Sequence, residues 1–239
     1  MDDSDPFVTA TRLPAGTRPL LGLTILVVED SRYACEAMRL LCLHSGARIR
    51  RADCLKSARR HLQIYRPSVI VIDMGLPDGS GADLIEELAQ ASPRVGVILG
   101  TSGDLAAEEL ALDSGADGFL AKPVSSLAAF QAEILKRLPA DRQPLGPRLL
   151  FDEHIRPDPL AYQDDMAHVA DILNERSDGQ TLDYVAQFIQ GVARSAEDHV
   201  LLTAAQALAR NRAHGAPVTA EAARVAGLVQ DRLHQKKAI

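Results

Sequence analysis

The segment TILVVEDSRY, residues 24–33, joins a short apolar run to two adjacent carboxylates and then to a helix-like sequence. The apolar and β-branched residues at its start are typical of a strand. Glu29 and Asp30, at the end of that strand, repel each other unless they are solvated, paired or bound to a cation. The segment therefore predicts either a sheet edge that faces water or a metal-binding site, and the rest of the chain decides between them.

The same succession of strand and helix occurs five times between residues 21 and 138. Short apolar runs predict strands at residues 23–28, 47–52, 68–73, 94–99 and 117–121. Amphipathic stretches predict helices near residues 32–45, 54–65, 80–91, 104–114 and 125–138. Because parallel neighbours need right-handed crossovers, these units predict an α/β fold, a five-stranded parallel sheet doubly wound by five helices. We expect the strand order 2-1-3-4-5.

The segments on either side of this region differ from it in composition. Residues 1–20 are acidic and proline-broken, which predicts a flexible N-terminal tail. Five of the 13 prolines lie between residues 139 and 159, so we expect a proline-rich linker at 139–158, either extended or strapped to the domain. The predicted organisation is therefore a tail at 1–20, an α/β domain at 21–138, a linker at 139–158 and a helical domain at 159–239.

Residues 159–239 carry four amphipathic stripes separated by short breaks, which predicts a small all-α bundle. Asp158 and Pro159 have the residue types of a helix N-cap and a first helical position. Ser195 and Asp198 have the spacing of an acidic capping box at the start of the third helix.

Composition excludes several classes of protein. Residues 1–139 carry 15 Lys/Arg against 18 Asp/Glu, and residues 140–239 carry 11 against 14, so neither part has the positive charge of a nucleic-acid binder. Cys35, Cys42 and Cys54 show no CxxC spacing, which favours a reducing compartment. With no 18-residue apolar run and an acidic N-terminus, we expect a cytoplasmic protein that does not enter a membrane.

Carboxylates follow two strands that are neighbours in the predicted sheet. Glu29 and Asp30 end the first strand and Asp73 ends the third. In this strand order the two ends flank the crevice where the order reverses, which is where ligands bind in doubly wound sheets. Three converging carboxylates are costly without a hard cation, and Mg²⁺ prefers oxygen ligands of this kind. The sequence therefore predicts a magnesium site at this crevice.

Two further strand ends add groups that suit a phosphoryl ligand. Thr101 and Ser102 follow the fourth strand, and Lys122-Pro123 follows the fifth, where the ammonium acts as a point charge. Together with the motifs VVED, VIDMGLPDGSG and SGADGFLAKP, this order of groups resembles the receiver domain of two-component response regulators. The resemblance covers about residues 22–138, half of the chain.

The resemblance implies a role for each residue at the crevice. Asp73 is the expected phosphoacceptor, a carboxylate nucleophile that takes the phosphoryl group from a phosphohistidine. Asp30 is expected to bind Mg²⁺ directly, Glu29 through water, and Gly75 through its backbone carbonyl. Lys122 is expected to hold a phosphoryl oxygen.

The resemblance also implies a conformational switch. Phe119 falls at the aromatic switch position, and the bond between Lys122 and Pro123 is expected to be cis. Counting 22 residues back from Lys122, the usual spacing in the family, gives Gly100 instead of Thr or Ser. Either Thr101 serves as the switch hydroxyl or that hydroxyl is absent, and we favour Thr101. Phosphorylation is then expected to draw in the loop after the fourth strand and to let Phe119 turn inward.

The predicted function is that of a bacterial response regulator in a two-component phosphorelay. Its expected partners are a histidine kinase or a histidine phosphotransfer protein, with Mg²⁺ as cofactor. The helical domain is expected to bind a protein partner or to form a homodimer. Its net charge argues against a DNA-binding module of the usual kind. No enzymatic activity is expected beyond self-catalysed phosphorylation and dephosphorylation of Asp73.

Two alternatives for the helical domain stay open. Instead of an interaction or dimerisation domain, it would be a degenerate histidine-phosphotransfer-like bundle or part of a scaffold that works without phosphorylation. Phosphotransfer domains resemble one another in an exposed His followed by Lys and Gly three and four residues on, and neither His168 nor His199 has this pattern. Two other uses of the sheet are excluded: a flavodoxin-type site needs a phosphate loop after the first strand, and a haloacid dehalogenase-type phosphatase needs an Asp where Arg32 stands.

Overall fold

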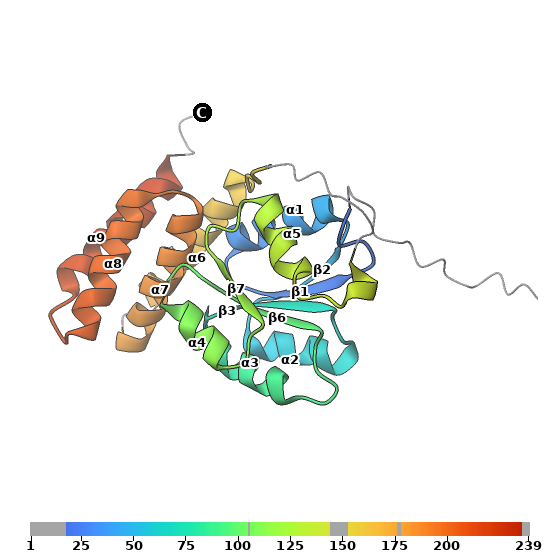
Figure 1. The fold of residues 1–239 in the computed structure, drawn as a ribbon. Coiled ribbons are helices and arrows are strands. Elements are labelled where there is room, and N and C mark those ends of the chain that lie inside the picture. The colour runs from blue at the N-terminus through green and yellow to red at the C-terminus, as the bar shows by residue number, and fades with distance from the viewer. Residues whose placement is uncertain (1–17, 105, 144–152, 176–177, 236–239) are drawn as a thin grey trace, which may run out of the picture.

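The computed structural model describes residues 18–104, 106–143, 153–175 and 178–235. It contains an α/β domain and a four-helix region that lies against one edge of the sheet, at the left in Figure 1. Most of the predicted tail and the middle of the predicted linker lie outside the described residues.

The α/β domain is built on a five-stranded parallel sheet of order β2-β1-β3-β6-β7, which confirms the predicted order. Its strands are β1 (Thr24–Val28), β2 (Arg48–Ala52), β3 (Val69–Asp73), β6 (Val97–Ser102) and β7 (Gly118–Ala121). A small antiparallel pair, β4 (Gly75–Leu76) and β5 (Gly79–Ser80), follows β3. Strand β6 lies three residues later than the predicted strand at 94–99, because Thr101 and Ser102 pair with Leu120 and Ala121 of β7.

Five helices cover the two faces of this sheet (Figure 1). One face carries α1 (Arg32–Ser45) and α5 (Leu127–Leu135), and the other carries α2 (Leu55–Ile64), α3 (Gly81–Gln90) and α4 (Ala107–Asp113). A short 3-10 turn, η1 (Ala140–Arg142), comes after α5. Ser31, Ser80 and Ser126 start α1, α3 and α5, since each side chain accepts a hydrogen bond from an N–H of the first turn.

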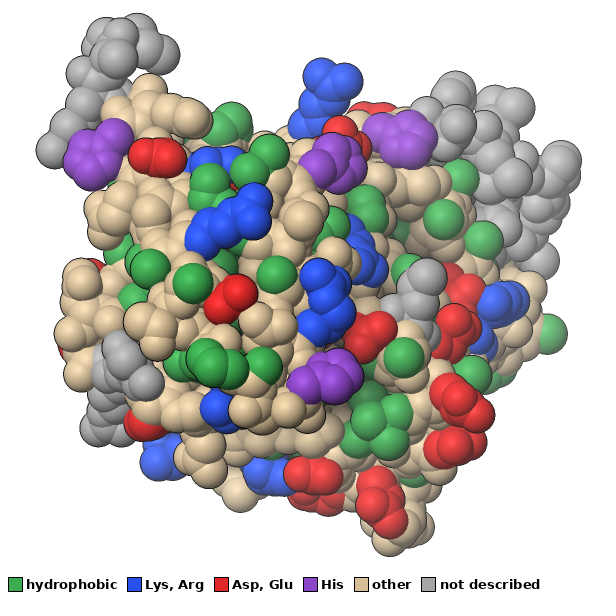
Figure 2. All heavy atoms as spheres, turned by 90° about the vertical axis from the view of Figure 1, so that its left-hand side faces the viewer, with side chains coloured by type: hydrophobic (Ala, Val, Ile, Leu, Met, Phe, Trp, Pro, Cys, Tyr) green, Lys and Arg blue, Asp and Glu red, His purple; other side chains and the backbone are tan. Residues whose placement is uncertain are grey.

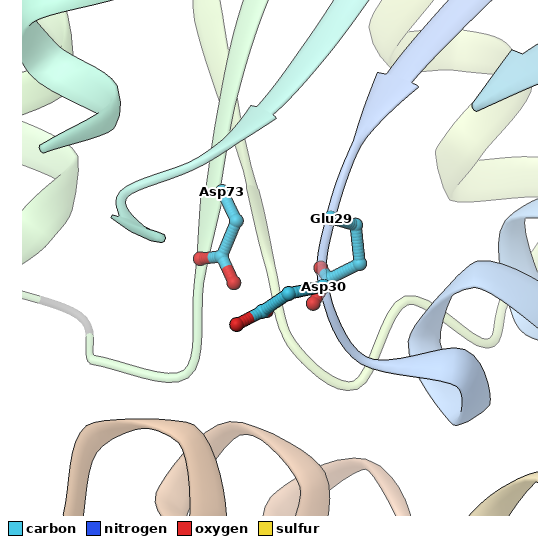
Figure 3. Close-up of side chains that lie close together, drawn as sticks. All are labelled: Glu29, Asp30 and Asp73. Carbon is cyan, nitrogen blue, oxygen red and sulfur yellow. The ribbon is translucent and has the colours of Figure 1, made fainter. Parts of the chain in front are cut away.

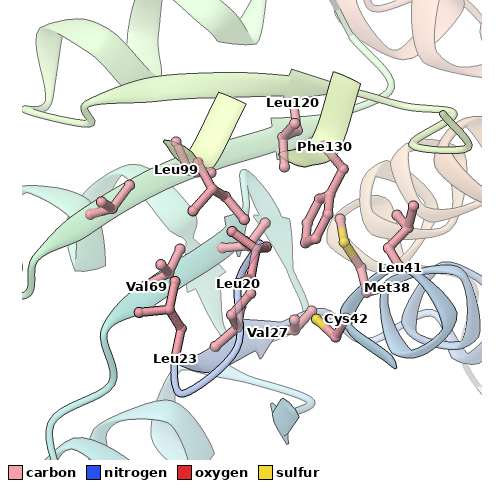
Figure 4. Close-up of a cluster of buried hydrophobic side chains, with 14 of the residues drawn as sticks. Leu20, Leu23, Val27, Met38, Leu41, Cys42, Val69, Leu99, Leu120 and Phe130 are labelled. Atoms are coloured by element: carbon pink, nitrogen blue, oxygen red, sulfur yellow. The ribbon is translucent and has the colours of Figure 1, made fainter. Parts of the chain in front are cut away.

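Side chains alternate along the strands between two hydrophobic cores, one on each face of the sheet. Ile25 and Val27 point into the core under α1 and α5, whereas Leu26 and Val28 point into the core under α2, α3 and α4. Figure 4 shows the first of these cores, where the fully buried ring of Phe130 meets side chains from β1 and α1. Strand β3 is buried along its whole length, as its continuous apolar run predicts.

One predicted boundary needs correction, and the structure decides between the two alternatives for the linker. The end of the tail at residue 20 is wrong, because Leu20 is fully buried in the first core and its N–H donates to the Ser45 carbonyl at 3.0 Å. The linker is strapped where it is described: the Ile155 N–H donates to the Ser125 carbonyl, and the Ile155 side chain joins the same core. The physical reason in both cases is that an isolated apolar residue in a polar segment still gains free energy by covering the core.

The four-helix region consists of α6 (Pro159–Glu175), α7 (Gly179–Ser195), α8 (His199–Ala213) and α9 (Thr219–His234). Helix α6 starts as predicted, with the Asp158 side chain accepting from the Leu160 N–H at 2.8 Å. Side chains from all four helices share one core that is separate from those of the sheet. This region is therefore a bundle with its own core, and we call it the helical bundle.

Asp198 ties three helices of the bundle together. It is the N-cap of α8, accepting from the Leu201 N–H, so the predicted capping box that starts at Ser195 is wrong. The same carboxylate accepts hydrogen bonds from Tyr162 on α6 and from Arg232 on α9. Ser195 instead ends α7, with its hydroxyl donating to the Gly191 carbonyl. Only three residues, 196–198, join α7 to α8, and the last of them, Asp198, caps α8 without a contribution from Ser195.

The lengths and polarities of the helices also bear on the membrane. Among the residues that the structure describes, no helix has the length and apolar character needed to cross a bilayer.

Candidate functional site

Three carboxylates meet at the carboxyl edge of the sheet, as the sequence predicts. Glu29 and Asp30 follow β1, Asp73 ends β3, and one ligand oxygen from each lies within 4.8 Å of the others. Figure 3 shows the three side chains at the ends of their strands, with helices of the bundle running directly below them. Glu29 is 2% exposed and Asp73 is 7% exposed, so these charges are held almost entirely away from water.

Lys122 supplies the positive charge of the site. It follows β7, and its ammonium lies 2.8 Å from Asp73 Oδ2 and 2.7 Å from Glu29 Oε2. Burial lowers the pKa of Lys122, but the carboxylates of Asp73 and Glu29 outweigh it and raise the pKa above its ordinary value. The lysine is therefore charged and bridges the two carboxylates that the sequence places on different strands.

One lysine does not balance three carboxylates. Burial, followed by repulsion from Asp73, raises the pKa of Glu29 well above its usual range and that of Asp30 to about 7. Burial is the larger cause of both shifts, and the repulsion from Asp73 adds to it because three carboxylates lie together at one lysine. A hard dication with oxygen ligands relieves this repulsion, so the residues present fit Mg²⁺.

Strand β6, the fourth strand of the parallel sheet, presents a different hydroxyl to the crevice from the one expected. Thr101 is fully buried inside β6, and its Oγ1 donates to the Leu120 carbonyl at 2.7 Å, so the prediction that Thr101 faces the crevice is wrong. Ser102, the next residue, lines the small cavity at Asp73 together with Lys122. The physical reason is the two-residue period of a strand, which turns neighbouring side chains to opposite faces.

The predicted aromatic switch is already inward. Phe119 is buried and pairs with Gly100 across β6 and β7, and its ring lies 3.1 Å from where a Cβ on Gly100 would be. Because Gly100 has no side chain, Phe119 occupies this space without phosphorylation, so the expected inward turn is not needed. The Lys122–Pro123 bond is cis, as the resemblance implies. Gly75 lies beside the site, with its N–H 3.4 Å from Asp73 Oδ1.

The helical bundle covers this site. The cavity at Asp73 has a volume of about 20 Å³, and helix α7 closes it with four residues. These residues are Gln187, Phe188, Gly191 and Val192. The sequence predicts a bundle beyond a linker but does not place it at the carboxyl edge of the sheet.

Polar contacts hold the bundle in this position. Asp165 of α6 is 2% exposed and accepts hydrogen bonds from the Ser31 hydroxyl at 2.7 Å and from the N–H groups of Arg32 and Tyr33 at 2.8 and 3.1 Å. Its carboxylate therefore sits at the positive N-terminal end of α1. On α7, the Tyr184 hydroxyl donates to Asp30 Oδ2 at 2.7 Å.

Sequence reasoning missed three residues of the bundle that contact the site or its surroundings, namely Asp165, Tyr184 and Gln187. Asp165 and Tyr184 have no local signal, because each looks like an ordinary polar residue of an amphipathic helix. Gln187 has one: it is followed by Gln190 and Gly191, at the three- and four-residue spacings of the phosphotransfer pattern. A search that starts only from histidines overlooks it.

Comparisons with known proteins find similarity to response regulators. Residues 25–134 match the family model of the response regulator receiver domain. The chain is 31% identical over 122 residues to the KDP operon transcriptional regulatory protein KdpE of Escherichia coli, covering 50% of this chain and 54% of KdpE. It is 34% identical over 104 residues to the probable transcriptional regulatory protein TcrX of Mycobacterium tuberculosis, covering 43% and 44%.

A solved structure with a similar fold is the receiver domain of the sensor histidine kinase PA1611 from Pseudomonas aeruginosa, which has a magnesium ion in its active site cleft. It is 24% identical, with a TM-score of 0.44, over 48% of this chain and 97% of that domain. The chain spans about half the length of the curated relatives named above. The family-model match, at residues 25–134, lies within the α/β domain.

Proposed function

Because residues 25–134 form a response regulator receiver domain, we propose that Asp73 accepts a phosphoryl group from a phosphohistidine, with Mg²⁺ bound at Glu29 and Asp30. The observation that carries this proposal is the cluster of three carboxylates with Lys122 2.8 Å from Asp73. The donor is a histidine kinase or a histidine phosphotransfer protein, as for the family in general.

Each residue of the cluster has a task in this transfer. An oxygen of Asp73 attacks phosphorus, the bond from phosphorus to the imidazole nitrogen breaks, and the nitrogen takes up a proton. Lys122 exchanges part of its contact with Asp73 for a phosphoryl oxygen, and Ser102 offers its hydroxyl to another. Asp30, Glu29 and the Gly75 carbonyl would hold Mg²⁺, which supplies positive charge to the phosphoryl oxygens when it is bound.

The chain needs no further catalytic group for this role. We propose that the protein is not an enzyme acting on a separate substrate, and that its only reactions are the phosphorylation and dephosphorylation of Asp73.

We assign a protein-contact role to the helical bundle, whose partner is another protein or a second copy of the chain. A degenerate phosphotransfer-like bundle is a second candidate. The spacing of Gln187, Gln190 and Gly191 favours it, because Gln187 and Gly191 line the cavity at Asp73. A scaffold that works without phosphorylation is the third candidate, and the intact acid cluster argues against it.

DNA binding is not part of this proposal, although KdpE and TcrX are named as transcriptional regulatory proteins. Residues 140–239 carry 11 Lys/Arg against 14 Asp/Glu. Figure 2 shows basic and acidic side chains interspersed on the side of the molecule formed by the bundle, without the basic stripe that binds phosphates.

The test is labelling of the full chain by acetyl phosphate with Mg²⁺. We expect the wild-type chain to be labelled and Asp73→Ala to lose the label entirely, because Asp73 is the proposed attacking carboxylate and lies 2.8 Å from the Lys122 ammonium that would hold a phosphoryl oxygen. Asp53→Ala, which removes an exposed carboxylate of a neighbouring loop, is the matched control and should keep the label. Retention of label in Asp73→Ala would place the acceptor elsewhere.

A further inference from the structure

We propose that α6 and α7 occupy the surface of the receiver domain on which a helical phosphohistidine donor must dock, so that the docked bundle and the donor exclude each other. This inference rests on the proposed function of Asp73. It adds an interaction surface, the rim around Asp73 together with the start of α1, and a partner chemistry, a helix that carries a phosphorylated imidazole.

The first observation is the size of the cavity at the phosphoacceptor. Its volume of about 20 Å³ is enough for about one water molecule. A phosphoryl group has three oxygens besides its phosphorus, and its donor must approach in line with the attacking oxygen of Asp73. Because α7 closes this cavity, neither the group nor the donor reaches Asp73 while the bundle is docked.

The second observation is that the metal side of the site stays open. A groove of about 940 Å³ runs between the receiver domain and α6, and Glu29, Asp30 and His168 are among its lining residues. Asp73 is not among them. The docked state therefore admits a cation to Asp30 and still withholds Asp73 from a phosphoryl donor.

The third observation is that the contact between bundle and receiver is specific. The buried carboxylate of Asp165 accepts three hydrogen bonds from residues 31–33, at the N-terminus of α1. Tyr184 donates to Asp30 from the adjacent helix. A buried carboxylate is costly to desolvate unless it is paired in this way, so the arrangement stabilises one docked position over others.

The fourth observation is the close approach of α7 to the rim. Gly103 follows β6 and Gly191 lies on α7, and a Cβ on Gly103 would lie 3.3 Å from the Cα of Gly191. The amide of Gln187 packs against Gly75, beside Asp73. Gln187 thus stands at the entrance through which a donor imidazole must pass, and an amide cannot carry a phosphoryl group to Asp73.

Donor binding and phosphorylation are then linked to undocking. The apparent reactivity of Asp73 is its intrinsic reactivity multiplied by the undocked fraction. A phosphoryl group on Asp73 shifts the population toward the undocked state, because only that state has room for it.

The experiment compares the full chain with Asp165→Ala, which removes the buried contact, and with Asp164→Ala. Asp164 is the adjacent residue and its side chain, paired with Arg32, is 54% exposed, so it is the matched control. We expect Asp165→Ala to be labelled by acetyl phosphate and Mg²⁺ about tenfold faster than wild type or more, and Asp164→Ala to change the rate by less than about twofold.

A second pair of variants removes one hydroxyl each and keeps the aromatic ring. Tyr184→Phe loses the hydrogen bond to Asp30 across the interface and should also be labelled faster than wild type. Tyr162→Phe loses a hydrogen bond of nearly the same length to Asp198 within the bundle and should not be. Both rings stay in place, so neither change is expected to unfold the bundle.

Hydrogen exchange of the Arg32 and Tyr33 amides reports docking independently of labelling. Their protection should be lost when beryllofluoride and Mg²⁺ are added to wild type, and lost without them in Asp165→Ala. Equal labelling rates in wild type, Asp165→Ala and Tyr184→Phe, or protection that beryllofluoride leaves unchanged, would overturn the inference. Absence of label in every variant would instead overturn the proposed function of Asp73.

Discussion

The Tyr184 hydroxyl donates a 2.7 Å hydrogen bond to Asp30 Oδ2, across a separation of 154 residues in the sequence. Burial and the nearby charge of Asp30 raise the pKa of Tyr184, so this hydroxyl stays protonated and keeps its role as the donor. One carboxylate of the candidate metal site is therefore also a contact point for the helical bundle. The acid cluster and the position of the bundle are not independent features of this molecule.

The excess negative charge at the site predicts the effect of Asp30→Asn. In EDTA we expect this change to raise the free energy of unfolding by about 1–2 kcal/mol, because it removes a charge held close to Asp73 and leaves an oxygen that accepts from Tyr184. With saturating Mg²⁺ the order should reverse, since wild type gains about 2.7 kcal/mol at one hundred times its Kd. Urea unfolding in both buffers measures this.

Asp53→Asn is the control for the Asp30 experiment, because its carboxylate is exposed. It should change the free energy of unfolding little in either buffer. If Asp30→Asn destabilised the metal-free protein, the account of the site as an excess of like charge would be wrong.

The two adjacent hydroxyls of β6 should behave differently. Ser102→Ala removes the hydroxyl that lines the cavity at Asp73, and we expect labelling by acetyl phosphate to slow about tenfold or more. Thr101→Val removes the hydrogen bond to the Leu120 carbonyl and should cost about 1–2 kcal/mol of stability with little change in labelling rate. Slower labelling in Thr101→Val alone would show that Thr101 is the phosphoryl ligand after all.

Asp198 predicts an acid-dependent loss of stability in the bundle. Burial works to raise its pKa, but hydrogen bonds from Arg232, the Leu201 N–H and Tyr162 outweigh burial and lower the pKa to about 2. A carboxyl group whose folded-state pKa is lowered contributes stability above its unfolded-state pKa of 3.8 and loses it as pH falls toward about 2. We expect this contribution to be about 1–2 kcal/mol, allowing for partial exposure.

Asp198→Asn isolates the charge, because Asn remains a good N-cap for α8. Urea unfolding at pH 6 should find the variant less stable than wild type, and the difference should shrink steadily between about pH 4 and pH 2. A difference that did not change with pH would mean that the charge of Asp198 contributes nothing.

Leu20 tests where the folded domain begins. Its side chain is fully buried in the core under α1 and α5, so Leu20→Ala should lower the free energy of unfolding by about 2–5 kcal/mol. Leu21→Ala, at a partly exposed neighbour, should cost about 1 kcal/mol or less. Equal effects in urea unfolding would mean that residues 18–20 are a dispensable part of the tail.

The α/β fold, the strand order and the meeting of Glu29, Asp30 and Asp73 all follow from local patterns in the sequence. They do so because side-chain periodicity is a local property and because parallel strands bring their carboxyl ends to one edge. The sequence also identified Lys122, which follows β7, the fifth strand of the parallel sheet. The ion pairs of Lys122 with Glu29 and Asp73 follow from that topology.

Tertiary structure alone decided which hydroxyl lines the cavity and where the bundle lies. The register of β6 against β7 turns Thr101 away and Ser102 inward, and a shift of one residue would exchange them. The position of the bundle depends on contacts such as Asp165 with the start of α1, which join residues more than 130 positions apart and leave no periodic trace in the sequence. Local patterns predict elements, whereas the docking of one domain on another is set by the fit of surfaces that exist only once both have folded.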